Sequence, residues 1–122
     1  MAEIFSVPLK AIVDEYTLES IYLPKPAEEI QILENDVTRP GLQLMGFYEY
    51  FNPERIQIFG KMEFAYLATI DEQTRYDRLD LLFSKQIPVV IVTRELEIYP
   101  EMATLAKKHS IPLLRTKEST ST

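Results

Sequence analysis

The sequence predicts an α/β fold with a small, mixed and mostly parallel sheet that is flanked by helices. The strongest signal is residues 88–92, a continuous apolar and largely β-branched run that is typical of a strand buried on both faces of a parallel sheet. Two strand–helix–strand patterns share this run. The first joins strand 56–59 to it through a helix at 71–84, and the second leads through a helix at 100–109 to strand 111–114. Such units require parallel pairing and a right-handed crossover.

The first third of the chain gives shorter signals. Residues 1–5 are expected to form a strand or an arm, and Ser6 is the expected cap of a helix with Pro8 in its first turn. Residues 18–23 predict a strand that ends at Pro24-Lys25-Pro26, because proline cannot continue a strand ladder. An opposite sense of pairing in these N-terminal strands would make the sheet mixed. Alternation predicts a further half-buried strand that contains Ile30, Ile32 and Val37.

Residues 36–61 contain all three glycines and predict a capped helix followed by a strand. The Thr38 hydroxyl is the expected helix cap, and Pro40 suits the first helical position. Asn52-Pro53 ends the helix, because the residue before a proline disfavours the α region. Four aromatic residues within 47–51 must occupy most sides of a helix end, so we expect Phe47 or Tyr50 to contact another domain or subunit. Helical spacing assigns one apolar face to Leu44, Phe47, Tyr48 and Phe51.

The remaining segments complete one domain. Residues 62–67 predict a short helix, and Thr69 to Asp71 offers the start of the next one, whose apolar stripe ends at Phe83 while its charged residues face solvent. Tyr99-Pro100-Glu101 begins the last helix. Residues 117–122 lack apolar side chains, which is typical of a linker. We therefore expect a domain over residues 1–116 and the start of a linker at residues 117–122.

Composition excludes several classes of function. The length of 122 residues favours one core, and the hydrophobic and charged fractions of 46% and 26% are ordinary for a globular domain. The absence of cysteine excludes disulfides, thiolate metal sites and cysteine nucleophiles. A net charge of −6 argues against sequence-independent nucleic-acid binding, which needs a basic face. Apolar runs are too short to cross a bilayer, and the N-terminus lacks a signal-peptide pattern, so we expect a cytoplasmic protein.

Catalytic motifs are missing from the chain. The three glycines cannot form a phosphate-binding loop, and one histidine, His109, cannot build a hydrolase triad or a histidine metal site. His109 is favoured at a helix C-terminus by the helix dipole, with a ligand or partner role as the alternative. Asp77 and Asp80 share one side of a helix. They are either a carboxylate pair for cation binding or acid–base work, or part of a solvated face compensated by Arg75 and Arg78.

A positional candidate is a site for an anion. In open α/β sheets, ligands bind in the crevice outside the carboxyl ends of the strands. Hydroxyl groups, guanidinium groups and helix N-termini suit phosphate or carboxylate. The residues predicted at such positions are Thr38, Arg39, Thr93, Arg94, Arg115 and Thr116. The alternative is that these arginines cap carbonyls or pair with Glu54, Glu95 and Glu97.

Several segments carry a family resemblance. Residues 38–47 read Thr-Arg-Pro-Gly-Leu-Gln-Leu-Met-Gly-Phe, followed by Tyr50-Phe51, by Pro-Glu-Arg-Ile-Gln at 53–57 and by Gly60-Lys61. Residues 87–94 read Ile-Pro-Val-Val-Ile-Val-Thr-Arg, and residues 109–116 read His-Ser-Ile-Pro-Leu-Leu-Arg-Thr. In order and spacing, this set resembles the N-terminal domain of HPr kinase/phosphorylase over roughly the whole chain. Glu95 departs from the family, which often has glycine there, and this weakens an expectation of close backbone approach.

The resemblance implies a fold similar to the first domain of the Mur ligases that bind a uridine-nucleotide sugar, with Thr38-Arg39 where those ligases carry a Ser/Thr-Arg segment. It implies a full-length hexamer that phosphorylates and dephosphorylates HPr with ATP or pyrophosphate and magnesium, in carbon catabolite regulation. HPr would bind through a kinase domain that lies beyond this chain. No catalytic residue and no cofactor or metal site of the family maps to this chain, which alone should be inactive.

Three functions are therefore expected in order of preference. The first is a non-catalytic regulatory or assembly domain whose partners are its own kinase domain and neighbouring subunits. The second is a sensor that binds an anionic metabolite or nucleotide through Arg39, Arg94 and Arg115. The third is a stand-alone interaction protein that shares the domain. A phosphate-binding loop encoded downstream of Thr122 would eliminate the third.

Overall fold

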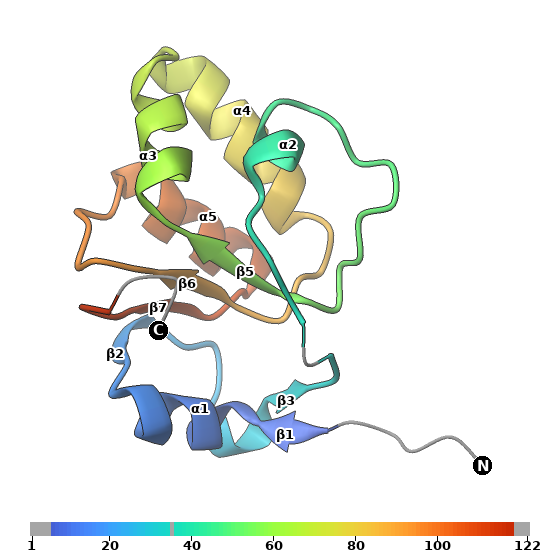
Figure 1. Cartoon of the computed structure of the whole chain (residues 1–122), viewed down its shortest axis with the longest axis vertical. Coiled ribbons are helices and arrows are strands. Elements are labelled where there is room, and N and C mark those ends of the chain that lie inside the picture. Colours follow the sequence, from blue (N-terminus) through green and yellow to red (C-terminus); the bar gives the residue numbers. More distant parts are fainter. Residues whose placement is uncertain (1–5, 35, 119–122) are drawn as a thin grey trace.

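A five-stranded sheet forms the centre of the computed structural model, which describes residues 6–34 and 36–118 (Figure 1). The strand order is β2-β7-β6-β5-β4. The pairs β4–β5, β5–β6 and β6–β7 are parallel, whereas β2 is antiparallel to β7. The prediction of a mixed, mostly parallel sheet is confirmed. The strands are β2 (Glu19–Tyr22), β4 (Val37–Thr38), β5 (Ile56–Phe59), β6 (Val90–Val92) and β7 (Leu113–Arg115).

Helices lie on both faces of this sheet. One face carries α2 (Gly41–Leu44), α3 (Lys61–Ala68), α4 (Glu72–Phe83) and α5 (Pro100–His109). The other carries α1 (Leu9–Tyr16), the 3-10 turn η1 (Ala27–Glu29) and a two-stranded sheet of β1 (Val7–Pro8) and β3 (Gln31–Ile32). Figure 1 shows α1, β1 and β3 below the sheet and the other helices above it.

Both strand–helix–strand predictions are confirmed. The chain runs β5–α3–α4–β6 and then β6–α5–β7, and both crossovers join parallel neighbours. All three residues of β6 are buried, as the continuous apolar run predicts. The observed boundaries are shifted by a few residues, since β6 begins at Val90 and β7 spans Leu113–Arg115.

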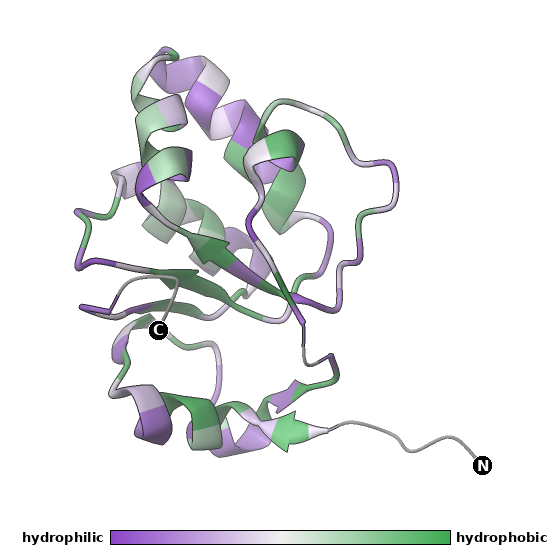
Figure 2. Ribbon diagram, viewed as in Figure 1, coloured by the Kyte–Doolittle hydropathy of each residue, from purple (hydrophilic) through white to green (hydrophobic). Residues whose placement is uncertain are grey.

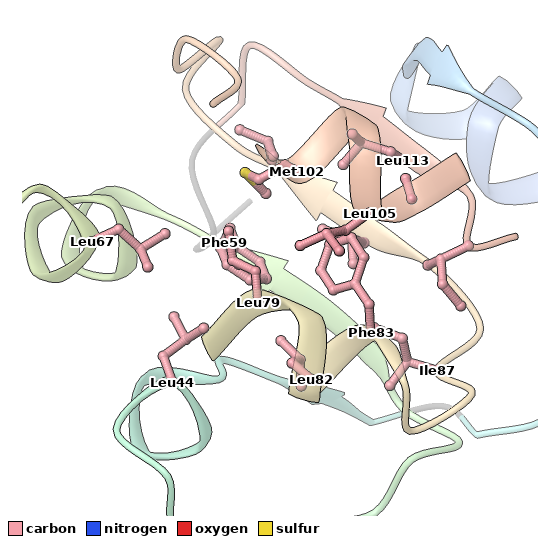
Figure 3. Packing of buried hydrophobic residues seen from close by; sticks show 14 of the residues in the cluster. Leu44, Phe59, Leu67, Leu79, Leu82, Phe83, Ile87, Met102, Leu105 and Leu113 are labelled. Atoms are coloured by element: carbon pink, nitrogen blue, oxygen red, sulfur yellow. The ribbon is translucent and has the colours of Figure 1, made fainter. Parts of the chain in front are cut away.

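Two apolar clusters, one on each face of the sheet, hold the layers together. The larger cluster joins the sheet to α2, α3, α4 and α5, and Figure 3 shows Phe59 and Phe83 packed at its centre. The hydropathy colouring in Figure 2 shows the green, apolar strands at the level where the layers meet. Each fully buried leucine or phenylalanine contributes about 1.5–3 kcal/mol. The smaller cluster consists of Leu9, Leu18, Ile30, Ile32, Ile56, Val89, Ile91 and Leu114.

The helix ends follow the sequence signals in the second half of the chain. Asp71 caps α4, and its Oδ1 accepts a hydrogen bond of 2.7 Å from the Thr74 N–H. Pro100 is the first residue of α5, where its missing N–H costs nothing. Ser110, in a left-handed conformation with φ of 56°, ends that helix.

The predicted long helix within residues 38–51 is wrong. Thr38 is the last residue of β4, and α2 contains only Gly41–Leu44. Gly46 has a φ of +99°, which a glycine tolerates and which turns the chain out of the helix. Tyr48 and Phe51 then fold back onto the larger cluster from a loop, so the i, i+3, i+4, i+7 pattern marks inward-facing residues without a helix.

Two N-terminal predictions are also corrected. Ser6 does not cap α1, because Pro8 occupies the cap position and the Ser6 hydroxyl donates to Gln31 Oε1 at 2.8 Å. The single strand predicted through Ile32 and Val37 is split into β3 and β4, which belong to different sheets. The strand or arm predicted at residues 1–5 and residues 119–122 of the linker lie outside the described residues.

Candidate functional site at the carboxyl edge of the sheet

The four parallel strands end at one edge, and the predicted anion-site residues follow three of them. Thr38-Arg39 lies at the end of β4, Thr93-Arg94 follows β6, and Arg115-Thr116 ends β7. Strand β5 separates β4 from β6. With neighbouring strands about 4.8 Å apart, β4 is roughly 10 Å from β6 and roughly 14 Å from β7. The three arginine backbones are therefore spread along the edge, and one small anion cannot touch all of them through backbone groups.

Arg39 is bound to an internal carboxylate. Its Nη2 donates to Glu63 Oε1 at 2.8 Å, and the Gly60 N–H donates to the same oxygen at 2.7 Å. Glu63 is the third residue of α3 and is only 5% exposed. A Cβ at Gly60 would lie 2.7 Å from Arg39 Nη2, so the glycine allows the guanidinium to approach the backbone.

The partner of Arg39 was missed at the sequence level, where Glu54, Glu95 and Glu97 were the expected partners. A signal was available, because a glutamate three residues after a helix cap commonly accepts a hydrogen bond from the cap N–H. The carboxylate that satisfies Gly60 in this way also neutralises Arg39.

Arg115 and the loop after β6 form a second set of contacts. Arg115 Nη2 pairs with Glu19 Oε1 at 3.0 Å, and its Nη1 donates to the Leu96 carbonyl at 3.2 Å. Arg94 and Glu95 both have left-handed backbones, with φ of 56° and 52°. Glycine adopts this conformation freely, which accounts physically for a glycine at the position of Glu95 in similar sequences.

Backbone hydrogen bonds fix the last described residues to this loop. The Arg94 N–H donates to the Glu118 carbonyl at 2.9 Å, and the Glu95 N–H donates to the Thr116 carbonyl at 2.8 Å. The Thr116 N–H donates to the Val92 carbonyl at 2.8 Å. Residues 116–118 are thus held at the carboxyl edge of the sheet, and the domain boundary placed at residue 116 stays a prediction.

A cavity of about 420 Å³ lies beside β7, between the end of α1, β2 and residues 115–118. It contains two of the predicted site residues, Arg115 and Thr116, whereas Thr38, Arg39 and Arg94 do not line it. Its charge is mixed, with four glutamates and two basic side chains. The lining consists of Glu15, Tyr16, Thr17, Glu19, Glu95, Arg115, Thr116, Lys117 and Glu118.

The two helical aspartates do not act as a pair. Asp77 Oδ1 accepts a hydrogen bond from Gln73 Nε2 at 2.9 Å. Asp80 Oδ1 lies 2.6 Å from His109 Nε2 and 3.1 Å from Lys108 Nζ, which ties α4 to α5. The hydrogen bond with His109, followed by that with Lys108, lowers the pKa of Asp80. Within residues 6–34 and 36–118, no group of three or more His, Asp and Glu side chains is arranged to hold a metal ion.

Arg75 was expected on a solvated face, and this was wrong. Its Nε donates to Glu101 Oε2 at 2.8 Å, and its Nη1 donates to the Leu67 carbonyl at 3.0 Å. The guanidinium also lies 4.4 Å from the centre of the Tyr99 ring, which stacks on Phe64. This arginine joins α3, α4 and α5, and no local pattern could indicate a partner 26 residues away.

The two predicted interface residues differ from the other aromatics of their loop. Tyr48 and Phe51 are half-buried and contact each other edge to face at 5.4 Å. Phe47 and Tyr50 are exposed, Tyr50 almost completely at 95%. Among the helices of the described residues, none is long and apolar enough to cross a membrane.

Comparisons with known proteins place these features in a family. The family model described as "HPr Serine kinase N terminus" matches residues 7–122. HPr kinase/phosphorylase of Lactococcus lactis subsp. lactis is 41% identical over 116 residues, which cover 95% of this chain and 38% of that protein. The Clostridium beijerinckii protein of the same name is 44% identical over 109 residues, covering 89% of this chain and 35% of the relative. The chain thus spans little more than a third of these relatives.

A solved structure has a similar fold. It contains the CBS and DRTGG domains of the regulatory region of Clostridium perfringens pyrophosphatase, complexed with the activator diadenosine tetraphosphate. The TM-score is 0.63 at 19% sequence identity, and the match covers 93% of this chain and 42% of that one. At this identity the likeness concerns the fold alone.

Proposed function

The chain belongs to the HPr serine kinase N-terminus family, and we propose that it is the non-catalytic, regulatory or assembly domain of a bifunctional HPr serine kinase/phosphorylase. The observation that carries this proposal is the family match over residues 7–122, together with relatives of that name whose length the chain covers to only 38%. The phosphoryl-transfer chemistry would then belong to the other part of the polypeptide.

The contacts of the polar side chains support a non-catalytic role. Arg39 and Arg75, two arginines that a phosphoryl-transfer site would use, are paired with Glu63 and Glu101. His109 contacts Asp80 across two helices. These groups join secondary-structure elements to one another, so their chemistry is spent on holding the fold.

The proposal assigns partners and cofactors to the whole protein. ATP or pyrophosphate, magnesium and HPr would bind to the kinase part. This domain would contact that part and neighbouring subunits of a hexamer, with Phe47 and Tyr50 as contact residues. Since HPr acts in sugar uptake and carbon catabolite regulation, we place the protein in the cytoplasm.

The test is a phosphorylation assay on the 122-residue chain. Mixed with HPr, ATP and magnesium, it should form no phosphoserine detectable by mass spectrometry, whereas the complete polypeptide encoded by the gene should form it. The Lactococcus lactis relative serves as the positive control for the assay. Phosphoserine produced by the isolated chain would contradict a non-catalytic role.

A second candidate function is the sensing of a small anionic ligand, favoured by the cavity that Arg115, Thr116 and Lys117 line. A ligand that binds only the folded state at ten times its Kd would stabilise it by roughly 1.4 kcal/mol. Thermal unfolding with nucleotides, sugar phosphates and uridine-diphosphate sugars should then show a shift. Arg94→Ala and Lys117→Ala, which remove exposed cations at this edge, should abolish it. No shift with any of these compounds would exclude this candidate.

A further inference from the structure

Four exposed apolar side chains surround the contact between α2 and α3. Leu42, Met45 and Phe47 belong to one turn, because the N–H groups of Met45 and Phe47 both donate to the Leu42 carbonyl, at 3.1 and 3.0 Å. Met62 is on α3, which packs against α2. Figure 2 shows α2 in strong green on the outside of the fold. We call these four residues the α2–α3 apolar surface.

These side chains are exposed on helices that already have a buried side. Leu44 of α2 and Leu67 of α3 are fully buried in the larger cluster. On the opposite side, Leu42, Met45, Phe47 and Met62 are 57%, 53%, 47% and 74% exposed. A helix with apolar residues on both sides is usually covered on both sides. The sheet covers only the inner one.

The size of this surface limits what can cover it. Large side chains of this kind expose roughly 150–200 Å² each when free, so the four together offer on the order of 400 Å². A stable complex of two separate molecules buries about 800 Å² per partner. The surface is about half of that and is too small for a stable pair formed with a second copy. Contacts between domains of one chain are smaller, at about 600–1,500 Å² in total, because the linker supplies an effective concentration of about millimolar.

The position of the surface favours a covalently linked occupant. Helices α2 and α3 begin directly after β4 and β5, at the carboxyl edge of the sheet. Residues 116–118 are held at the same edge by the Arg94 and Glu95 N–H groups. Two strand spacings separate β7 from β5, about 10 Å, a distance that three or four extended residues cover. A domain that follows residue 122 would start beside the α2–α3 apolar surface.

We propose that the kinase part of the same polypeptide docks on the α2–α3 apolar surface. This inference rests on the proposed function, which supplies the linked domain. It extends the expected contact at Phe47 to three further residues on two helices. Because all four side chains are uncharged, the docking face of the partner is aliphatic or aromatic.

Hydrogen exchange measured by mass spectrometry tests this docking. In the complete polypeptide, amides of residues 41–47 and 61–63 should exchange about tenfold more slowly than in the isolated 122-residue chain, because docking suppresses local opening. The double variant Leu42→Glu/Met62→Glu should remove that difference. Leu81→Glu is the matched control, since Leu81 is 43% exposed near the end of α4 that is remote from the carboxyl edge, and it should keep the difference.

Three results would overturn the docking. Equal exchange in the complete polypeptide and the isolated chain would do so even if the complete polypeptide phosphorylates HPr, in which case the proposed function stands. Dimerisation of the isolated chain at roughly 100 µM in sedimentation, reversed by the double variant, would identify a second copy as the occupant. A complete polypeptide without HPr kinase activity would remove the proposed function and this docking together.

Discussion

Residues 87–116 and residues 36–61 carry equally specific family segments, yet they are built in different ways. The first stretch is regular, since β6, α5 and β7 bury apolar faces in the pattern that their sequences display. The second contains a two-residue strand, a one-turn helix and a long loop before β5. Its glycines serve close contacts and a turn: Gly60 admits Arg39, and Gly46 turns the chain. A conserved-looking motif therefore does not indicate regular structure, and the two stretches should respond differently to substitution.

The largest effect is expected in the regular stretch, for Leu105→Ala. Leu105 on α5 is fully buried between the helices and the sheet, so its loss leaves a cavity and should lower the free energy of unfolding by about 2–5 kcal/mol. Leu42→Ala, in the motif-rich stretch, is the matched control and should change it by less than about 0.5 kcal/mol. Urea unfolding followed by circular dichroism measures both. A similar loss in both variants would mean that Leu42 is packed as tightly as Leu105.

This contrast explains how far the sequence predicts the fold. Periodicity finds α4, α5 and β6 because their pattern extends over several residues with one buried side. The loop at residues 47–51 has helical spacing by coincidence, because Tyr48 and Phe51 reach the core from irregular backbone. No pattern could have identified the loop, although Gly46 inside the proposed helix was a warning.

The candidate site was predictable only in part, for a related reason. Strand order brings Thr93-Arg94 and Arg115-Thr116 to neighbouring strand ends, as a parallel sheet requires. The pairings of Arg39 with Glu63 and Arg75 with Glu101 join residues 24 and 26 positions apart. Such contacts depend on the packing of whole helices, which local sequence does not specify. They turn expected surface arginines into groups that connect elements.

The second prediction sharpens the role of glycine in residues 36–61. Gly60→Ala places a Cβ 2.7 Å from Arg39 Nη2 and displaces the guanidinium from the buried Glu63, which should cost about 1–3 kcal/mol of stability. Gly41→Ala is the control, because its nearest atom would be 3.9 Å away and nothing has to move. In the variant Arg39→Met, adding Gly60→Ala should cost clearly less than it does in the wild type. Additive losses would show that Gly60 acts independently of Arg39.

The third prediction concerns alkaline pH and the loop. Burial raises the pKa of Tyr48 from 10.0 to about 12, against the opposing effect of Arg78. The unfolded chain therefore releases the phenolic proton first, and stability falls as pH rises above 10, by about 1 kcal/mol at pH 11. Tyr48→Phe should flatten this fall between pH 9 and 11, while Tyr50→Phe, at the exposed position, should not. Contact with Asp80 raises the pKa of Lys108, but this contribution is common to all three proteins and cancels. Equal slopes in Tyr48→Phe and the wild type would contradict the burial of the Tyr48 hydroxyl.

The smallest effect belongs to the regular stretch and to acid pH. The contacts with His109 and Lys108 lower the pKa of Asp80, so the folded state binds its proton less readily than the unfolded chain does. Their stabilisation is complete above the usual carboxyl range and is lost as pH falls through it. Since Asp80 is partly exposed, Asp80→Asn should lower the free energy of unfolding at pH 6 by less than about 1 kcal/mol, and the gap should close below about pH 3. Asp77→Asn removes the same charge from α4 without touching α5 and controls for net charge. A gap that persists at pH 2 would show that Asp80 stabilises the α4–α5 contact through something other than its charge.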